Sequence, residues 1–164
     1  MILLRFRDIS IPDGETIIRH KSISSKLGFV WWGWITRAEE AFPTHDLVEI
    51  SRRLEESSEP IMMVHTDFNV FYQAEVLTVH AHLDGKKMHT PQEDYTPKYM
   101  HENQCTAWFK LSRIASCKQS QIKKVAAAPT ILSPNGFDET LLKETPIPVK
   151  FFKSSGATLW IIDP

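Results

Sequence analysis

The spacing of apolar and polar residues predicts a chain built mainly from β-strands. A strand with one buried face alternates the two kinds of residue, and a fully buried strand is a short apolar run. The predicted strands are residues 1–11, 29–35, 61–64, 70–82, 105–114, 147–153 and 157–162. Asp67, Phe68 and Asn69 are a turn signal between two of them, so residues 60–82 are expected to form a β-hairpin.

Two segments in the first third of the chain have helical spacing instead. Over residues 15–27 the apolar positions share one face, Asp13 is placed to cap the N-terminus, and Gly28 is placed to end the helix. The apolar face of this helix comprises Ile17, Ile23 and Leu27. A second helix is predicted to begin at Thr44. Its apolar stripe comprises Leu47, Ile50 and Leu54.

These elements together predict an α+β domain. The expected fold is a curved, mixed, mostly antiparallel sheet or small open barrel, with two N-terminal helices packed against it. The chain of 164 residues suits a single domain. Residues 84–104 are polar and proline-containing, and a loop of that length inside a domain is usually functional. We therefore expect this loop to act as a lid over a binding site.

Composition narrows the class of protein. The hydrophobic fraction of 42% and charged fraction of 24% are those of an ordinary globular domain. No apolar run approaches the roughly 20 residues of a membrane helix, and the N-terminus carries charge too early for a signal peptide. Cys105 and Cys117 lack the spacing of a zinc site, and Cys105 is predicted to be a buried thiol. We expect a cytoplasmic protein with reduced thiols and no membrane partner.

Charge is unevenly distributed, although the net charge is only −1. Residues 38–59 contain seven acidic side chains and two arginines, a local charge of −5. Residues 98–124 contain six basic side chains and one glutamate, a local charge of +5. Either these are two solvated faces, or the basic segment contacts a phosphate. On the second interpretation Lys110, Arg113 and Lys118 are expected to lie together beside the binding site.

The most unusual motif is Val30-Trp31-Trp32-Gly33-Trp34. On a strand, Trp32 and Trp34 share one face while Trp31 and Gly33 share the other. Glycine within a strand often marks the close approach of a ligand or another backbone, and a flat ligand can stack on tryptophan. Buried aromatic residues are also ordinary components of a core. The motif therefore predicts either a binding wall or a core strand, and both interpretations stay open.

Catalytic signals are weak. His80, His82 and Asp84 alternate on one face of a strand, which would present two imidazoles and a carboxylate to a metal. Along a strand these groups span about 13 Å, too far for one ion without a bend, so solvated strand-end histidines are the favoured interpretation. Glu75, within an apolar strand, is interpreted as a polar outward residue. No nucleophile elbow, P-loop or dinucleotide fingerprint occurs. We predict no catalytic residue, no metal and no cofactor.

Four segments in order resemble the PUA-like superfamily, in particular its EVE and ASCH relatives. They are the aromatic strand Phe29–Ile35, then Pro60–His65, then Val70–Val76 with a small residue before Glu-Val, and finally Thr106–Leu111. The resemblance covers about residues 29–114. It implies a small curved barrel whose pocket is walled by aromatic side chains. Such pockets commonly hold a nucleobase, often a modified one, within DNA or RNA.

The favoured hypothesis is a non-catalytic module that binds a nucleotide or modified nucleobase in an aromatic pocket. The candidate ligand-binding residues are Trp31, Trp32, Trp34, Tyr72, Tyr95, Tyr99, Trp108, Lys110 and Arg113. Two alternatives stay open, a regulatory protein-interaction domain and a small metal-dependent hydrolase. The apolar segment 157–162 lies just before the end of the sequence. We therefore also expect an N-terminal module that acts on a downstream domain of the same polypeptide.

Overall fold

The computed structural model describes residues 2–35, 51–52, 54–56, 60–65, 70–118, 130–132 and 159–163, and all structural statements concern these residues. In chain order the elements are β1 (Ile2–Phe6), α1 (Glu15–Leu27), β2 (Val30–Trp34), β3 (Pro60–His65), β4 (Val70–Ala81), the 3₁₀ turns η1 (Glu93–Tyr95) and η2 (Lys98–Met100), β5 (Ala107–Cys117), β6 (Thr130–Leu132) and β7 (Leu159–Asp163). Residues 51–52 and 54–56 are also helical.

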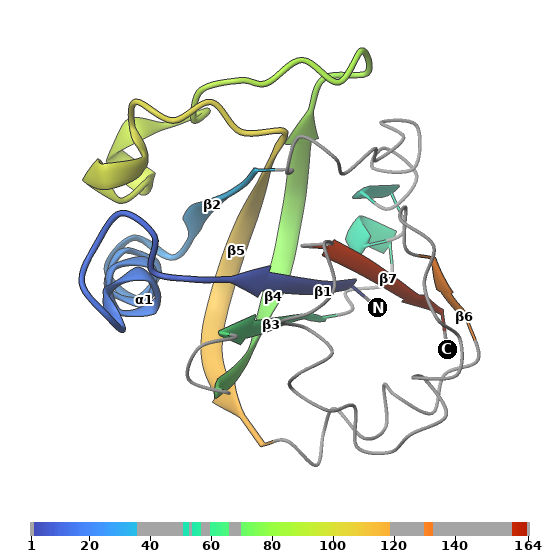
Figure 1. Ribbon diagram of the computed structural model, residues 1–164, viewed down its shortest axis with the longest axis horizontal. Coiled ribbons are helices and arrows are strands. Elements are labelled where there is room, and N and C mark those ends of the chain that lie inside the picture. The colour runs from blue at the N-terminus through green and yellow to red at the C-terminus, as the bar shows by residue number, and fades with distance from the viewer. Residues whose placement is uncertain are drawn as a thin grey trace.

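The strands form one mixed sheet in the order β2-β5-β4-β3-β1-β7-β6 (Figure 1). Among the described pairs, β1 and β3 run parallel and the other five pairs are antiparallel. The predicted α+β fold with a curved, mostly antiparallel sheet is thereby confirmed, as is the β3–β4 hairpin, although the turn at 67–69 lies outside the described residues. None of the described helices is long and apolar enough to cross a membrane.

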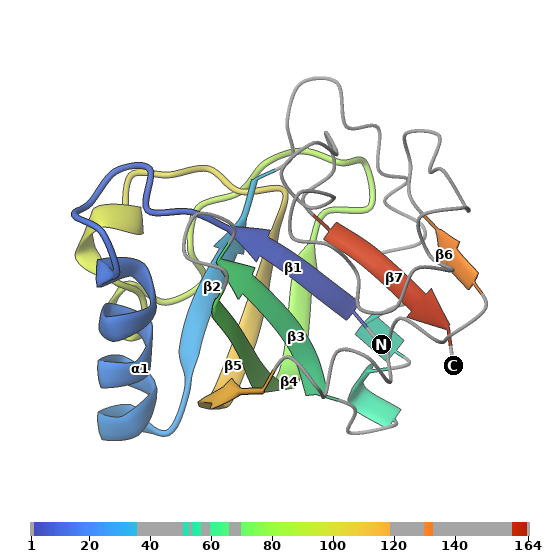
Figure 2. The ribbon, with the colours of Figure 1, turned by 60° about the horizontal axis from the view of Figure 1, so that its bottom comes forward.

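The sheet curls strongly, so that β2, the first strand in the sheet order, comes to lie against β1, the fifth. In Figure 2, β1 and β3 cross in front of β2 and β5, and α1 stands beside them. β1 and β2 are not neighbours in the sheet order, yet Phe6 of β1 meets Trp32 of β2 with ring centroids 5.1 Å apart. We call this closing line between β1 and β2 the seam. The connection from β1 to β2 through α1 runs along it.

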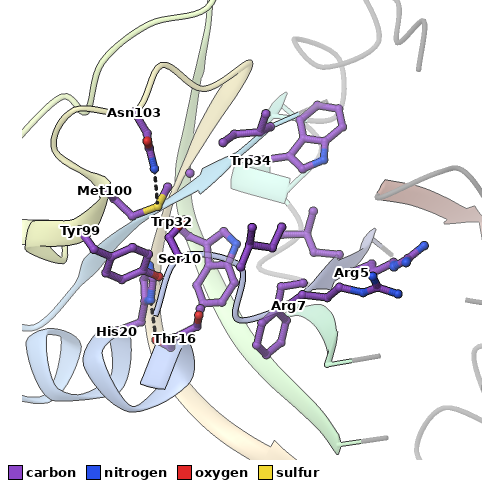
Figure 3. A pocket seen from close by; sticks show the side chains of 15 residues that line it. Arg5, Arg7, Ser10, Thr16, His20, Trp32, Trp34, Tyr99, Met100 and Asn103 are labelled. Atoms are coloured by element: carbon purple, nitrogen blue, oxygen red, sulfur yellow. Dashed lines mark hydrogen bonds between the residues drawn. The ribbon is translucent and has the colours of Figure 1, made fainter. Parts of the chain in front are cut away.

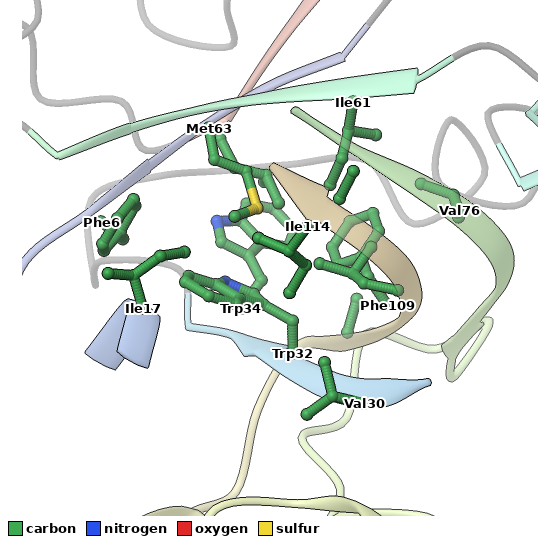
Figure 4. Packing of buried hydrophobic residues seen from close by; sticks show 14 of the residues in the cluster. Phe6, Ile17, Val30, Trp32, Trp34, Ile61, Met63, Val76, Phe109 and Ile114 are labelled. Atoms are coloured by element: carbon green, nitrogen blue, oxygen red, sulfur yellow. The ribbon is translucent and has the colours of Figure 1, made fainter. Parts of the chain in front are cut away.

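The inside of the curl is the main hydrophobic core (Figure 4). Val30 and Phe109 are fully buried there, and Trp32 and Trp34 join them from β2. Ile17 contributes from α1. The alternation along β2 therefore places its tryptophans as predicted, because Trp31 belongs to a separate cluster on the opposite face.

Helix α1 begins and ends for reasons that are partly local. Gly28 ends it in the left-handed conformation, with φ of 90°, and its N–H donates to the carbonyl of Ser24, as the sequence predicts. The prediction that Asp13 caps the N-terminus is wrong. The carboxylate of Asp8 accepts the N–H groups of Gly14 and Thr16 at 2.7 and 3.0 Å. A capping side chain six residues before Gly14, the N-cap position, makes a tertiary contact that local spacing cannot reveal.

Other expectations are revised in detail. Leu27 is 46% exposed rather than part of the apolar face of α1. β5 continues to Cys117, and Cys105 lies before it, in the separate cluster rather than with Phe109. Leu54 is buried within a helical stretch, as predicted. Thr44, Leu47, Ile50 and the segment 147–153 lie outside the described residues.

Candidate functional site

A cavity of about 360 Å³ opens along the seam, within the size range of small-molecule sites. We call it the seam cavity (Figure 3). Four segments contribute side chains to it: β1 with its connection to α1, α1 itself, β2, and the end of the 84–104 loop. The lining residues are Leu4, Arg5, Phe6, Arg7, Ile9, Ser10, Thr16, His20, Trp32, Gly33, Trp34, Ile35, Tyr99, Met100 and Asn103.

Trp32 forms the central wall of the cavity. Its indole meets Phe6 in an edge-to-face contact, with ring centroids 5.1 Å apart, and His20 in a tilted contact, with ring centroids 4.2 Å apart. Tyr99 reaches the same imidazole from the loop, with centroids 6.3 Å apart. Aromatic side chains from a strand, a helix and a loop thus meet at one place. A surface of this kind suits a flat, conjugated ligand.

His20 is the unusual polar group of the cavity. Its ring is buried, and Nδ1 lies 2.7 Å from the carbonyl oxygen of Thr16. A carbonyl only accepts, so Nδ1 carries the proton and Nε2 presents a lone pair. Nε2 is buried without a hydrogen-bond partner among the residues that the structure describes. Burial lowers the pKa of His20 to about 4, so the imidazole is neutral at pH 7.

Asp8 connects α1 to β3 beside the cavity. Besides capping α1, its carboxylate accepts a 2.7 Å hydrogen bond from Nε2 of His65 at the end of β3, and both side chains are almost fully buried. Burial acts to raise the pKa of Asp8, but the hydrogen bonds from Thr16, Gly14 and His65 outweigh it and lower the pKa to about 2. The contact links α1 to the sheet and so sets the distance between two walls of the cavity.

The two ends of the cavity differ in polarity. His20, Thr16 and Tyr99 lie at one end and Arg5 and Arg7 at the other, with Trp32 between them (Figure 3). Arg5 is buried and Arg7 is exposed. The described lining contains these two guanidinium groups and no carboxylate. The arrangement is chemically suited to a ligand with a flat polar part and a negative charge some distance from it.

Five of the nine sequence-predicted site residues fall into two groups. Trp32, Trp34 and Tyr99 line the seam cavity. Trp31 and Trp108 pack with Met100 and Cys105 into a second buried cluster, which we call the loop cluster because the 88–105 segment covers it. Within this segment Met88 pairs with Cys105 in an isolated β-bridge. The indole N–H of Trp31 donates to the side-chain oxygen of Gln92, and the indole N–H of Trp108 donates to the carbonyl of Met88.

The remaining predicted residues lie outside the cavity lining, and their roles in binding stay predictions. Tyr72 packs at the edge of the core, 6.1 Å from Phe6. Tyr95 stacks on Phe29 at 4.2 Å, and the ammonium of Lys110 lies 3.9 Å from the same ring. Arg113 forms a 2.9 Å ion pair with Glu75. Lys118 is exposed at the far end of the β5 segment.

Gly33 also has a different role from the one expected. A methyl group on its Cα would lie 2.5 Å from Sγ of Cys105 and within 2.9 Å of Met100 and Trp108. The position opposite Trp32 and Trp34 is therefore filled by side chains of the loop cluster. Glycine is needed for the close approach of the protein's own loop to β2.

The sequence reading missed Arg5, Arg7 and His20. A signal was present for each. The arginines alternate with apolar residues in Leu3-Leu4-Arg5-Phe6-Arg7, which places a charge within a core strand. His20 falls among Ile17 and Ile23 on the apolar face of a helix, where a polar residue needs a partner. That His20 faces the tryptophan strand depends on tertiary packing.

His80, His82 and Asp84, whose favoured interpretation is that of solvated strand-end groups rather than a metal motif, are all exposed. The ring of His80 packs against Trp31 at 4.9 Å, and Asp84 pairs with Lys86 at 2.9 Å. Within the described ranges, no three histidine, cysteine, aspartate or glutamate side chains are grouped closely enough to hold a metal ion.

Comparison with known proteins identifies a family. A family model described as "Pua-like" matches residues 2–163, almost the whole chain. A search of curated proteins returns no match, and neither does a search of solved structures.

Proposed function

The chain belongs to the PUA-like family, and from this premise we propose that it is a non-catalytic recognition module that binds a nucleotide or a nucleobase within nucleic acid. The ligand occupies the seam cavity. The observation that carries the proposal is the combination, in one cavity, of the Trp32 wall with the two arginines at its end. A base stacked on tryptophan contributes about 1–3 kcal/mol to binding, and a guanidinium is the preferred partner of phosphate.

The local character of the positive charge fits this proposal. The chain as a whole carries a net charge of −1, which does not favour binding along an extended polyanion. Arg5 and Arg7 concentrate positive charge at the cavity itself. We therefore expect recognition of one or a few nucleotides, with a shallow dependence of affinity on salt.

The experiment compares an arginine of the cavity lining, Arg7, with an arginine on β5 outside it, Arg113. Mononucleotides and short labelled oligonucleotides, both single- and double-stranded, are titrated against the protein while tryptophan fluorescence and anisotropy are followed. Arg7→Gln, at the cavity, should weaken binding several-fold and reduce the salt dependence by about one ion. Arg113→Gln is the matched control, because Arg113 is also exposed but lies outside the cavity lining.

Two results would contradict the proposal. No nucleotide or oligonucleotide binding by the wild-type protein would remove its basis. A larger loss with Arg113→Gln than with Arg7→Gln would instead place the binding surface on the basic β5 segment, as the charge pattern of the sequence suggested.

One observation favours the alternative of a protein-interaction domain. Ile9 is 86% exposed and Ile35 is 45% exposed, and both border the seam cavity. An apolar rim of this kind also suits a protein side chain inserted into the cavity. Replacing Ile9 with Ser distinguishes the two functions, because a protein complex should lose affinity by tenfold or more, while nucleotide affinity should fall by a much smaller factor.

A further inference from the structure

The buried, unpaired Nε2 of His20 indicates which chemical group of a ligand the seam cavity recognises. A buried polar atom without a partner costs about 1–3 kcal/mol, and such atoms are rare in native proteins. His20 is the group with this property among the described side chains, and it lines the cavity. The neighbouring residues that the structure describes give Nε2 no hydrogen bond. Thr16 bonds to the other ring nitrogen, Nδ1, and Trp32 and Tyr99 contact the imidazole through their rings.

The hydrogen bond to Thr16 fixes what Nε2 can do. Because Nδ1 carries the proton, Nε2 is an acceptor and pairs only with an N–H or O–H donor. An anionic oxygen at this position would face a lone pair and be repelled. A phosphate therefore fits the Arg5 and Arg7 end, and a donor group fits the His20 end.

We propose that His20 is the specificity-determining residue of the site and that its Nε2 accepts a hydrogen bond from an N–H group on the edge of the bound base. The inference rests on the proposed function and deepens it, since it selects bases that retain this N–H and orients them with the phosphate toward the arginines. Bases in which methylation has replaced the N–H are rejected, because they leave Nε2 unpaired.

Access to Nε2 requires a small movement of the loop. The atom is enclosed, and Tyr99, whose ring lies 6.3 Å from the imidazole, is the partly exposed side chain beside it. A base that stacks on Trp32 approaches His20 from the Tyr99 side. For the base to enter, the Tyr99 ring has to turn outward, away from its contact with the Arg19 guanidinium at 5.9 Å.

The test compares nucleotides in which methyl groups replace the N–H donors of the base. Four pairs of 5′-monophosphates are titrated: adenosine with N6,N6-dimethyladenosine, cytidine with N4,N4-dimethylcytidine, uridine with 3-methyluridine, and guanosine with N1,N2,N2-trimethylguanosine. The wild-type protein should bind the unmethylated member of its preferred pair at least tenfold more tightly. In His20→Phe, which keeps a flat ring but has no acceptor, this ratio should fall to about one.

A steric or purely structural role of His20 predicts a different pattern. If the added methyl groups are rejected by size alone, the discrimination persists in His20→Phe, and the inference is overturned. His20→Phe also removes the Nδ1 hydrogen bond to Thr16, so the discrimination ratio, and not the free energy of unfolding, separates the two roles.

A second measurement does not depend on the variant. In protein labelled with ¹⁵N-histidine, the Nε2 resonance of His20 should move upfield on saturation with the preferred nucleotide, because its lone pair becomes an acceptor. An unchanged resonance at saturation overturns the inference while leaving the proposed function in place. If the wild-type protein binds none of the eight nucleotides, both the proposed function and this inference fail.

Discussion

The two faces of β2 carry the same kind of side chain but meet different surroundings. On one face, Trp32 and Trp34 border the seam cavity, together with buried polar groups such as His20. On the other face, Trp31 packs with Trp108 in the loop cluster, sealed by the 88–105 segment. Both indole N–H groups of the loop cluster are hydrogen-bonded, whereas the cavity face contains an unpaired nitrogen.

This difference indicates that one face of β2 is structural and that the other is the candidate binding face. The two indole N–H groups of the loop cluster bond to neutral acceptors, so these hydrogen bonds should vary little with pH. The cavity face is held by the Asp8–His65 contact and contains His20, so its stability should depend on protonation. Four predictions sharpen this comparison, and each compares a group on one face with a control.

The largest effect is expected from Asp8→Ala. The substitution leaves the N–H groups of Gly14 and Thr16 and the imidazole of His65 without their acceptor. Removing one partner of a buried contact of this type costs about 3–5 kcal/mol. Urea denaturation at pH 7 measures the loss. Asp13→Ala is the control and should change the free energy of unfolding by less than about 0.5 kcal/mol, because Asp13 is exposed.

The second effect is the pH dependence contributed by His20. Its pKa is lowered from 6.5 to about 4, so the unfolded chain binds a proton in that range and the folded chain does not. Stability from this group is complete above pH 6.5 and is lost as pH falls toward 4, by at most about 3 kcal/mol. His20→Phe should lack this component in urea denaturation between pH 7 and 4.

The groups near His20 do not share this pH window. Burial raises the pKa of Tyr99, which stays neutral there, and Asp8, with a pKa of about 2, stays ionised. Parallel pH profiles for the wild-type protein and His20→Phe would show that the imidazole is not buried and neutral as described.

The third effect concerns the loop face. Gly33→Ala places a methyl group against Cys105, Met100 and Trp108, and overpacking of this kind costs about 1–3 kcal/mol. Cys105→Ala removes Sγ, the nearest of these atoms, so the double substitution should be more stable than the two single effects predict. Strict additivity in the double-mutant cycle would mean that Gly33 and Cys105 do not press on each other.

The smallest effect is expected from Gln92→Ala. It removes the 3.1 Å hydrogen bond from the indole of Trp31, and Gln92 is exposed, so water replaces the lost acceptor. The cost should be about 0.5–1 kcal/mol and the same at pH 4.5 and pH 7. A cost that grows as pH falls would contradict the idea that neutral contacts hold the loop face.

Much of the fold could be predicted from the sequence, but less of the site. The β3–β4 hairpin, α1 with its Gly28 end and the two faces of β2 are all confirmed, because each depends on residues close together in the chain. Of the nine predicted site residues, Trp32, Trp34 and Tyr99 line the cavity, and Asp8, Arg7 and His20 were not singled out. Their importance arises from contacts between segments far apart in sequence.

The sequence alone determined which tryptophans share a face, because the side chains of any strand alternate with a period of two. It did not determine which face borders a cavity. That depends on the curl of the sheet, which brings β1 against β2 although β5, β4 and β3 lie between them in the sheet order. It depends also on the packing of the 88–105 segment, which fills the position left by Gly33 and closes the opposite face. Hydrophobic patterning identifies buried positions, but only the closure of the sheet on itself decides where burial is incomplete.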